Sequence, residues 1–197
     1  MQNEKLSVRQ KLAMFHGTTI SAEQALMMDE KDITYDMWTA HGVTALNLVT
    51  AELRPMTLKK FGLSNPQQMR RIGFDALHLT DPLFCNEANA AFGAESVIEA
   101  FLTTPSDAVA LAGSEALTTL GISMQRLLEA CAGAPTEACA VVQQDKSPEP
   151  LKDVPATVVL DTGIRAPQLK SFGINVIRAV QQMNASNDEM RKFGFVL

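Results

Sequence analysis

Glycines recur along this chain at intervals close to ten or twenty residues. Of the eleven glycines, only Gly17 lies before Gly42, and the last is Gly194. Seven share a frame in which one apolar residue stands four positions before the glycine and another directly follows it. Glycine adopts the left-handed conformation without a Cβ clash, and an apolar residue after it packs back on the last helical turn. The frame therefore predicts a helix end at each copy.

The seven copies differ in how completely they match the frame. Five are clear and two are weaker. The clear copies span residues 58–63, 69–74, 117–122, 169–174 and 190–195, and the weaker ones span 38–43 and 159–164.

Helix starts are marked by an independent signal. Asn65, Asp81 and Thr104 each precede a proline. Such a residue offers a side-chain acceptor at the N-cap, and proline is well tolerated at the first helical position. Ser186 and Glu189 have the spacing of a capping box. These signals predict where individual helices begin.

Start and stop signals lie so close together that each helix has only about two turns. Helices this short are not stable alone and must pack against neighbours. The chain is 46% hydrophobic and shows no sustained alternation of apolar and polar residues. The β-branched stretch at 154–159 is interrupted by Pro155, which favours a helix over a strand. We therefore predict an all-α, solenoid-like array of short paired helices, with a repeat of about 21 residues per pair.

The pattern also predicts how the array is divided. Residues 1–35 are expected to form an N-terminal helical cap, because they lack the regular spacing. Residues 36–144 form a helical repeat region, and residues 154–197 form the C-terminal helical repeats. Between them, residues 145–153 contain two prolines and five charged residues, which is typical of an exposed connector. This connector is a candidate hinge or loop.

The sequence lacks the signals of several functional classes. The polar N-terminus has no apolar core of the kind a signal peptide needs, and no apolar run approaches membrane-spanning length. Cys85, Cys131 and Cys139 are expected to be reduced, buried thiols. We therefore expect a soluble, intracellular protein with no membrane partner, in the cytoplasm or within a large assembly.

The sequence contains no recognisable catalytic or cofactor motif. His16, His41 and His78 do not have the spacing of a metal site, and no nucleophile elbow, phosphate loop or dinucleotide fingerprint is present. The sequence accordingly predicts neither a metal nor another cofactor. An enzyme would require residues that only folding brings together.

Basic residues recur just before the glycines. Lys59 and Lys60 precede Gly62, and Arg70 and Arg71 precede Gly73. In a stacked array they could form a basic ridge along a phosphate backbone. Basic residues in a last turn also complement the helix dipole, and the net charge of −5 disfavours nucleic acid. Nucleic-acid binding is therefore the less favoured alternative.

Charge and aromatic residues point instead to a protein partner. The net charge is +4 over residues 53–79 and −8 over residues 80–150, a contrast that can orient self-association or binding to another protein. Tyr35 and Trp38 are the only members of their types and lie on one helical face. They are either a packing pair or an interface anchor.

The C-terminal tail is a further candidate contact. Phe195, Val196 and Leu197 form an apolar tail after Gly194. An exposed tail of this kind would be a liability, so we expect it to pack on the last repeat or on a partner.

The stretch from about Trp38 onward resembles a style of repeat. Units of the Leu-x-x-Phe-Gly-Ile type, as in residues 58–63 and 169–174, are similar to those of short-helix solenoids in proteins of unicellular eukaryotes and large DNA viruses. This resemblance implies a scaffold for protein contacts, such as a structural component of a virion. The sequence therefore favours a non-enzymatic scaffold over a nucleic-acid-binding repeat protein, and either over an unrecognised enzyme.

Overall fold

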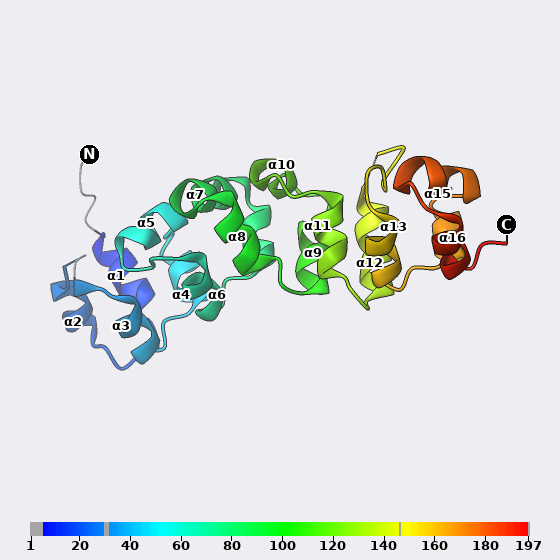
Figure 1. Cartoon of the computed structure of the whole chain (residues 1–197). Helices are drawn as coiled ribbons and strands as arrows, with labels where there is room; N and C mark the ends of the chain where they lie inside the picture. Colours follow the sequence, from blue (N-terminus) through cyan, green and yellow to red (C-terminus); the bar gives the residue numbers. More distant parts are fainter. Residues whose placement is uncertain (1–5, 30–31, 146, 197) are drawn as a thin grey trace. The chain divides into compact units, whose positions relative to one another are not determined.

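The computed structural model describes residues 6–29, 32–145 and 147–196 of the chain. These residues form the α-helices α1–α16 and the 3-10 helix η2, with no strand among them (Figure 1). The predicted all-α class is therefore confirmed. By contacts the chain divides into an N-terminal unit, Met1–Phe101, and a C-terminal unit, Leu102–Leu197. This boundary lies inside the predicted repeat region 36–144.

The helices of both units are short. The longest, α7, has 11 residues and most have six to eight. The N-terminal unit contains α1 (Val8–Met14), α2 (Ala22–Met27), α3 (Tyr35–Ala40), α4 (Ala45–Thr50), α5 (Pro55–Lys60), α6 (Pro66–Arg71), η2 (Ala76–Thr80), α7 (Pro82–Phe92) and α8 (Ala94–Phe101). The C-terminal unit contains α9 (Pro105–Leu111), α10 (Ala116–Leu120), α11 (Met124–Ala130), α12 (Pro135–Gln144), α13 (Ala156–Asp161), α14 (Ala166–Ser171), α15 (Val176–Met183) and α16 (Asn187–Phe193).

The predicted helix starts are confirmed. Asn65, Asp81 and Thr104 are the N-caps of α6, α7 and α9, and a proline follows each of them. The Ser186–Glu189 capping box is present at the start of α16. Each cap satisfies backbone N–H groups that have no partner inside the helix.

The glycine frame marks helix ends through a specific hydrogen bond. All eleven glycines have a positive φ. In six of the seven frames, the backbone N–H of the residue that follows the glycine donates a hydrogen bond. The acceptor is the carbonyl of the apolar residue four positions before the glycine, as in a Schellman motif. These N···O distances are 2.9 Å for Val43–Trp38, 3.2 Å for Leu63–Leu58, 3.1 Å for Phe74–Met69, 2.9 Å for Ile122–Leu117, 2.9 Å for Ile174–Leu169 and 3.0 Å for Phe195–Met190.

An additional copy of the motif lacks glycine. Glu52 follows α4 with a φ of 60°, and the Leu53 N–H donates to the Leu48 carbonyl at 2.9 Å. Left-handed backbone is unfavourable for a residue with a Cβ, so glycine spacing alone does not reveal this helix end.

Buried residues repeat in the same register around successive helices. Three segments bury the residue before the N-cap, the first helical residue, the fourth helical residue and the residue at the C-cap. The sets are Val43, Ala45, Leu48 and Ala51; Leu53, Pro55, Leu58 and Phe61; and, in the C-terminal unit, Val154, Ala156, Val159 and Thr162.

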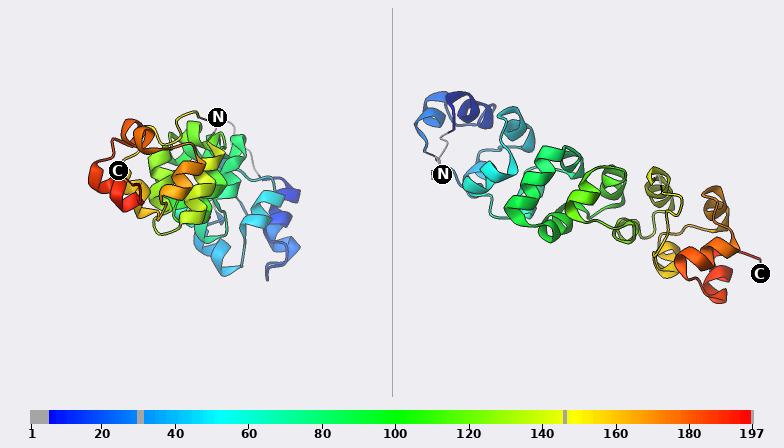
Figure 2. Two further views of the ribbon diagram at one scale, coloured as in Figure 1. Left: turned by 90° about the vertical axis from the view of Figure 1, so that its right-hand side faces the viewer. Right: turned by 90° about the horizontal axis from the view of Figure 1, so that it is seen from above.

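Some helices pack on the helix numbered two higher, and others pack on the helix numbered three higher, as α1 does on α4, α9 on α12 and α13 on α16. The first group includes α5 with α7, α6 with α8, α9 with α11 and α11 with α13. Figure 2 shows the same ribbon from two further sides, coloured along the sequence. The Ala45 N–H at the start of α4 donates to the Ile72 carbonyl at the end of α6, at 2.8 Å. A Cβ on Gly62, at the end of α5, would lie 3.2 Å from Thr34 Cα at the start of α3. Close approach of helix ends therefore requires small residues there.

The segment between α12 and α13 is tied to the C-terminal unit. The described residues of the 145–153 stretch form no helix, and Lys146 lies outside them. Leu151 is fully buried, and the Asp153 N–H donates to the Gln182 carbonyl at 2.9 Å. The segment is therefore anchored at its C-terminal end.

Candidate interaction surfaces

Three exposed apolar side chains lie on neighbouring elements of the N-terminal unit. Met56 on α5, Leu77 on η2 and Leu83 on α7 are 43%, 62% and 57% exposed. α7 contacts both α5 and η2. Each of the three is the second residue of its helix. We call these three residues the apolar surface.

A charged pair stands beside the apolar surface. Glu87 is one turn after Leu83 on α7, and its Oε2 accepts the Met56 N–H at 3.3 Å. Its Oε1 lies 4.0 Å from Nη1 of Arg54. Arg54 is the N-cap of α5 but makes no side-chain cap bond, so Glu87 provides the missing acceptor from another helix. This contact fixes α5 against α7 and gives the apolar surface a charged border.

The predicted aromatic pair is split by burial. Trp38 is fully buried, and its Nε1 has no hydrogen-bond partner. Tyr35 is half-buried at the start of α3. Trp38 is the fourth residue of α3 and is buried in the core, so it is a packing residue. Its side chain is not on the surface that a partner would contact, which corrects the interface alternative for this residue.

The predicted basic residues do not share one environment. The Lys59 ammonium donates to the Ala91 carbonyl near the end of α7 and lies 5.6 Å from the centre of the Phe92 ring. Lys60 and Arg71 are exposed, and Arg70 is half-buried. Lys59 therefore satisfies a helix-end carbonyl, the structural role that the helix dipole favours.

The two basic pairs also lie at the ends of helices that pack on different neighbours. Lys59 and Lys60 end α5, which packs on α7, whereas Arg70 and Arg71 end α6, which packs on α8. Equivalent positions two helices along carry no basic pair: α7 ends at Phe92 and α8 at Phe101. A continuous basic ridge does not follow from this packing.

The C-terminal tail is partly buried. Phe195 is 6% exposed, its ring centre lies 6.4 Å from that of Phe193, and the Lys170 ammonium lies 5.9 Å from its centre. Val196 is 95% exposed. Leu197 lies outside the described residues. Phe195 is therefore buried beside Phe193 of α16 and Lys170 of α14, while Val196 is exposed.

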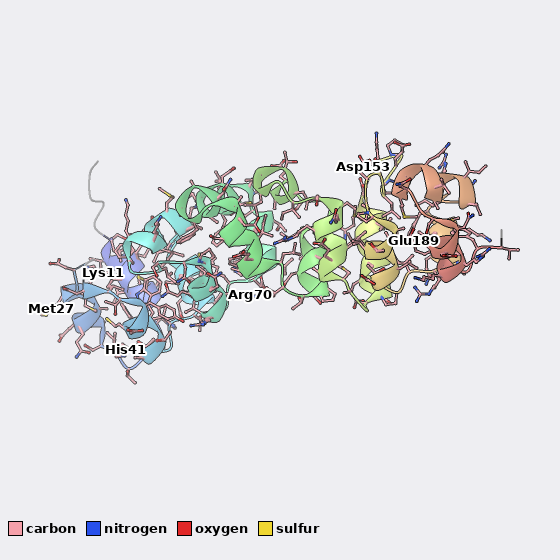
Figure 3. All side chains as sticks on the ribbon, in the orientation of Figure 1. Lys11, Met27, His41, Arg70, Asp153 and Glu189 are labelled. Atoms are coloured by element: carbon pink, nitrogen blue, oxygen red, sulfur yellow. The ribbon has the colours of Figure 1, made fainter. Side chains whose placement is uncertain are left out.

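Two pockets of the C-terminal unit differ in character. A hollow of about 300 Å³, lined mainly by apolar residues that include Leu117, Met124 and Leu127, lies between α9, α10, α11 and α12. A more polar pocket of about 450 Å³ lies where the segment before α13 meets the end of α15, and Gln182 and Glu189 line it. Figure 3 labels Asp153 on that segment and Glu189 on α16.

The titratable residues make local structural contacts. His41 Nδ1 lies 3.2 Å from Thr19 Oγ1, and His78 Nδ1 lies 2.7 Å from Asp75 Oδ1. Burial raises the pKa of Cys131 to about 11, with a further contribution from Glu137. Within the described ranges, no three His, Cys, Asp or Glu side chains are placed to hold a metal ion, and no helix could cross a membrane.

Comparison of the chain with models of known protein families, with curated proteins and with solved structures finds no match. The functional assignment therefore depends on the geometry alone. Sequence reasoning missed Met56, Leu77 and Leu83. A signal was available, because each directly follows the alanine or proline that begins its helix.

Proposed function

We propose that this chain is a non-enzymatic helical-repeat scaffold that binds another protein or a second copy of itself. The apolar surface of Met56, Leu77 and Leu83 carries this proposal. Single exposed apolar residues are ordinary, but clustered ones on rigid helices are typical of protein interfaces. All three keep their side chains in solvent, while other positions of the same segments, such as Leu58, Leu79 and Cys85, are buried.

The repeated register supports a solenoid-like array. α5 begins 20 residues after α3, and α6 begins 21 residues after α4. The set of four buried positions recurs in both units. The helix pairs that make the most contacts are near one another in the chain, which is the arrangement expected of stacked repeats. A scaffold built in this way suits a structural component of a larger assembly, such as a virion, as the resemblance of the repeats implies.

The proposal is tested with the full chain carrying both Leu77→Gln and Leu83→Gln. Both side chains are exposed, so the substitutions should leave the fold intact. If a partner buries them, each leucine contributes about 1.5–3 kcal/mol, and the double variant should bind at least about a hundredfold more weakly. Self-association is measured by sedimentation over a range of concentrations. Another partner is identified by affinity purification and then measured with purified components.

Leu46→Gln is the matched control. Leu46 is also the second residue of its helix and is 73% exposed, but it lies on α4, which carries no residue of the apolar surface. It should bind like the parent chain. A chain that stays monomeric and retains no partner would refute the scaffold. Retention on RNA at low salt that is lost in Lys60→Gln with Arg71→Gln would favour the nucleic-acid alternative.

A further inference from the structure

The polar pocket of the C-terminal unit contains an unsatisfied buried group. Gln182, near the end of α15, is 6% exposed and lines the pocket. Its backbone carbonyl accepts the Asp153 N–H at 2.9 Å, but its side-chain Oε1 has no hydrogen-bond partner. A buried acceptor without a donor is unfavourable and uncommon in folded proteins. A ligand that brings N–H donors to this side of the pocket would give the amide oxygen the partner that it lacks.

The ionisable residues that line this pocket are both carboxylates. They are Asp153, before α13, and Glu189, on α16. One oxygen of Glu189, Oε2, accepts the Ser186 N–H at 2.8 Å and the Ser186 hydroxyl at 2.7 Å. These bonds hold the carboxylate in place and lower its pKa. Glu189 is consequently an oriented anion at neutral pH.

Neutral polar groups complete the lining. Asn184 contributes a side-chain amide, and Thr157 contributes a hydroxyl. Asp153 and Asn184 have φ values of 61° and 51°, so they are two of the three non-glycine residues with left-handed backbone in the described ranges. Lysine and arginine are absent from the lining. The lining thus offers several acceptors and no cation, while Lys192, outside the lining, contributes to the lowered pKa of Glu189.

We propose that this pocket binds a guanidinium group, supplied by an arginine of a partner protein. A guanidinium presents five N–H donors in a planar fork, which matches carboxylate and amide oxygens. A metal ion fits less well, because the pocket offers two carboxylates, and no three His, Cys, Asp or Glu side chains of the described residues are placed to hold one. That a protein supplies the guanidinium rests on the proposed scaffold function. That the pocket prefers a guanidinium rests only on the residues that line it.

The test is a titration of the full, isotopically labelled chain followed by NMR. The probes are arginine amide and three blocked tripeptides, Ac-Gly-X-Gly-NH₂, in which X is arginine, lysine or citrulline. We expect the arginine probes to shift the side-chain amide signals of Gln182 and Asn184 and the backbone signal of Asp153. Citrulline has the shape of arginine without its charge, so it should bind at least about tenfold more weakly.

Two variants locate the binding. Glu189→Gln removes the charge but keeps the capping box, since glutamine also caps at this position. It should weaken the arginine peptide about tenfold or more. Asp188→Asn is the matched control: it removes one negative charge from the same helix at an exposed residue outside the pocket lining, so binding should be nearly unchanged.

Several outcomes would overturn the inference. They are no shift at these three residues with either arginine probe, equal binding of the citrulline or lysine peptide, or equal weakening by the two variants. Binding of arginine amide together with a chain that retains no protein partner would leave the pocket standing and refute only the scaffold. If the leucine variants lose the partner but Glu189→Gln does not weaken its binding, the partner uses the apolar surface alone, and the proposal that its arginine enters the pocket is refuted.

Discussion

Replacing Glu52 with glycine should stabilise the N-terminal unit. Glu52 ends α4 with a φ of 60°, in a position where other copies of the motif have glycine. A residue with a Cβ pays about 1–2 kcal/mol for the left-handed conformation. Glycine avoids that cost but loses about 0.4–1 kcal/mol through the greater freedom of the unfolded chain. The net gain in unfolding free energy should be about 0.5–1 kcal/mol.

The assay is urea unfolding followed by fluorescence of Trp38. This is the sole tryptophan of the chain, it is fully buried, and it lies in the same unit as Glu52. The midpoint should rise with an unchanged slope, and the midpoint of thermal unfolding should rise by about 2–8 °C for a unit of this size.

Glu52→Ala is the control, because it removes the same charge and carboxylate but keeps the Cβ. It should give no comparable gain, since alanine pays the same conformational cost. Equal stabilisation by alanine and glycine would show that the charge of Glu52, and not its backbone conformation, is unfavourable. A loss of stability in Glu52→Gly would refute the assignment of this position to the repeated motif.

Further expectations follow from the glycines, a cysteine and a capping box. Gly62→Ala should destabilise more than Gly42→Ala in the same urea assay, because a Cβ on Gly62 meets backbone at 3.2 Å while one on Gly42 meets nothing within 4 Å; similar losses would contradict the close packing of helix ends. Cys131, with its pKa raised to about 11, should react with a thiol reagent at pH 8 only as fast as the protein unfolds, and rapid labelling of the native chain would show that it is accessible. Hydrogen bonds from Ser186 lower the pKa of Glu189, so this box should add stability above the unfolded pKa and lose it as pH falls through the lower folded value. In Glu189→Gln, unfolding measured against pH should lack that component, and an unchanged profile would contradict it.

Much of the secondary structure could be predicted because its signals are local. Asn65, Asp81 and Thr104 cap helices through their own side chains, and proline after each is favourable whatever surrounds it. The glycine frame likewise depends on bonds within six residues of chain. Glu52 escaped because its left-handed conformation is set by the motif around it and not by its own preference.

The candidate site was less predictable because it depends on contacts between distant residues. Lys59 has the pattern of a phosphate-binding residue, but a carbonyl 32 positions away occupies it. Trp38 has the pattern of an interface anchor, yet the packing of α3 buries it. Met56 and Leu83 lie 27 positions apart and become neighbours only through the packing of α5 on α7.

The amino-acid sequence alone determined that this protein is built from short, capped helices, because caps, prolines and left-handed glycines act within a single turn of chain. The tertiary structure alone decided which side chains of those helices are free. A two-turn helix has few faces, and whether Gln182 stays unpaired or Lys59 becomes engaged depends on the element that packs against it. The packing of one helix on another decides which of these side chains find a partner, and local sequence patterns do not specify that packing.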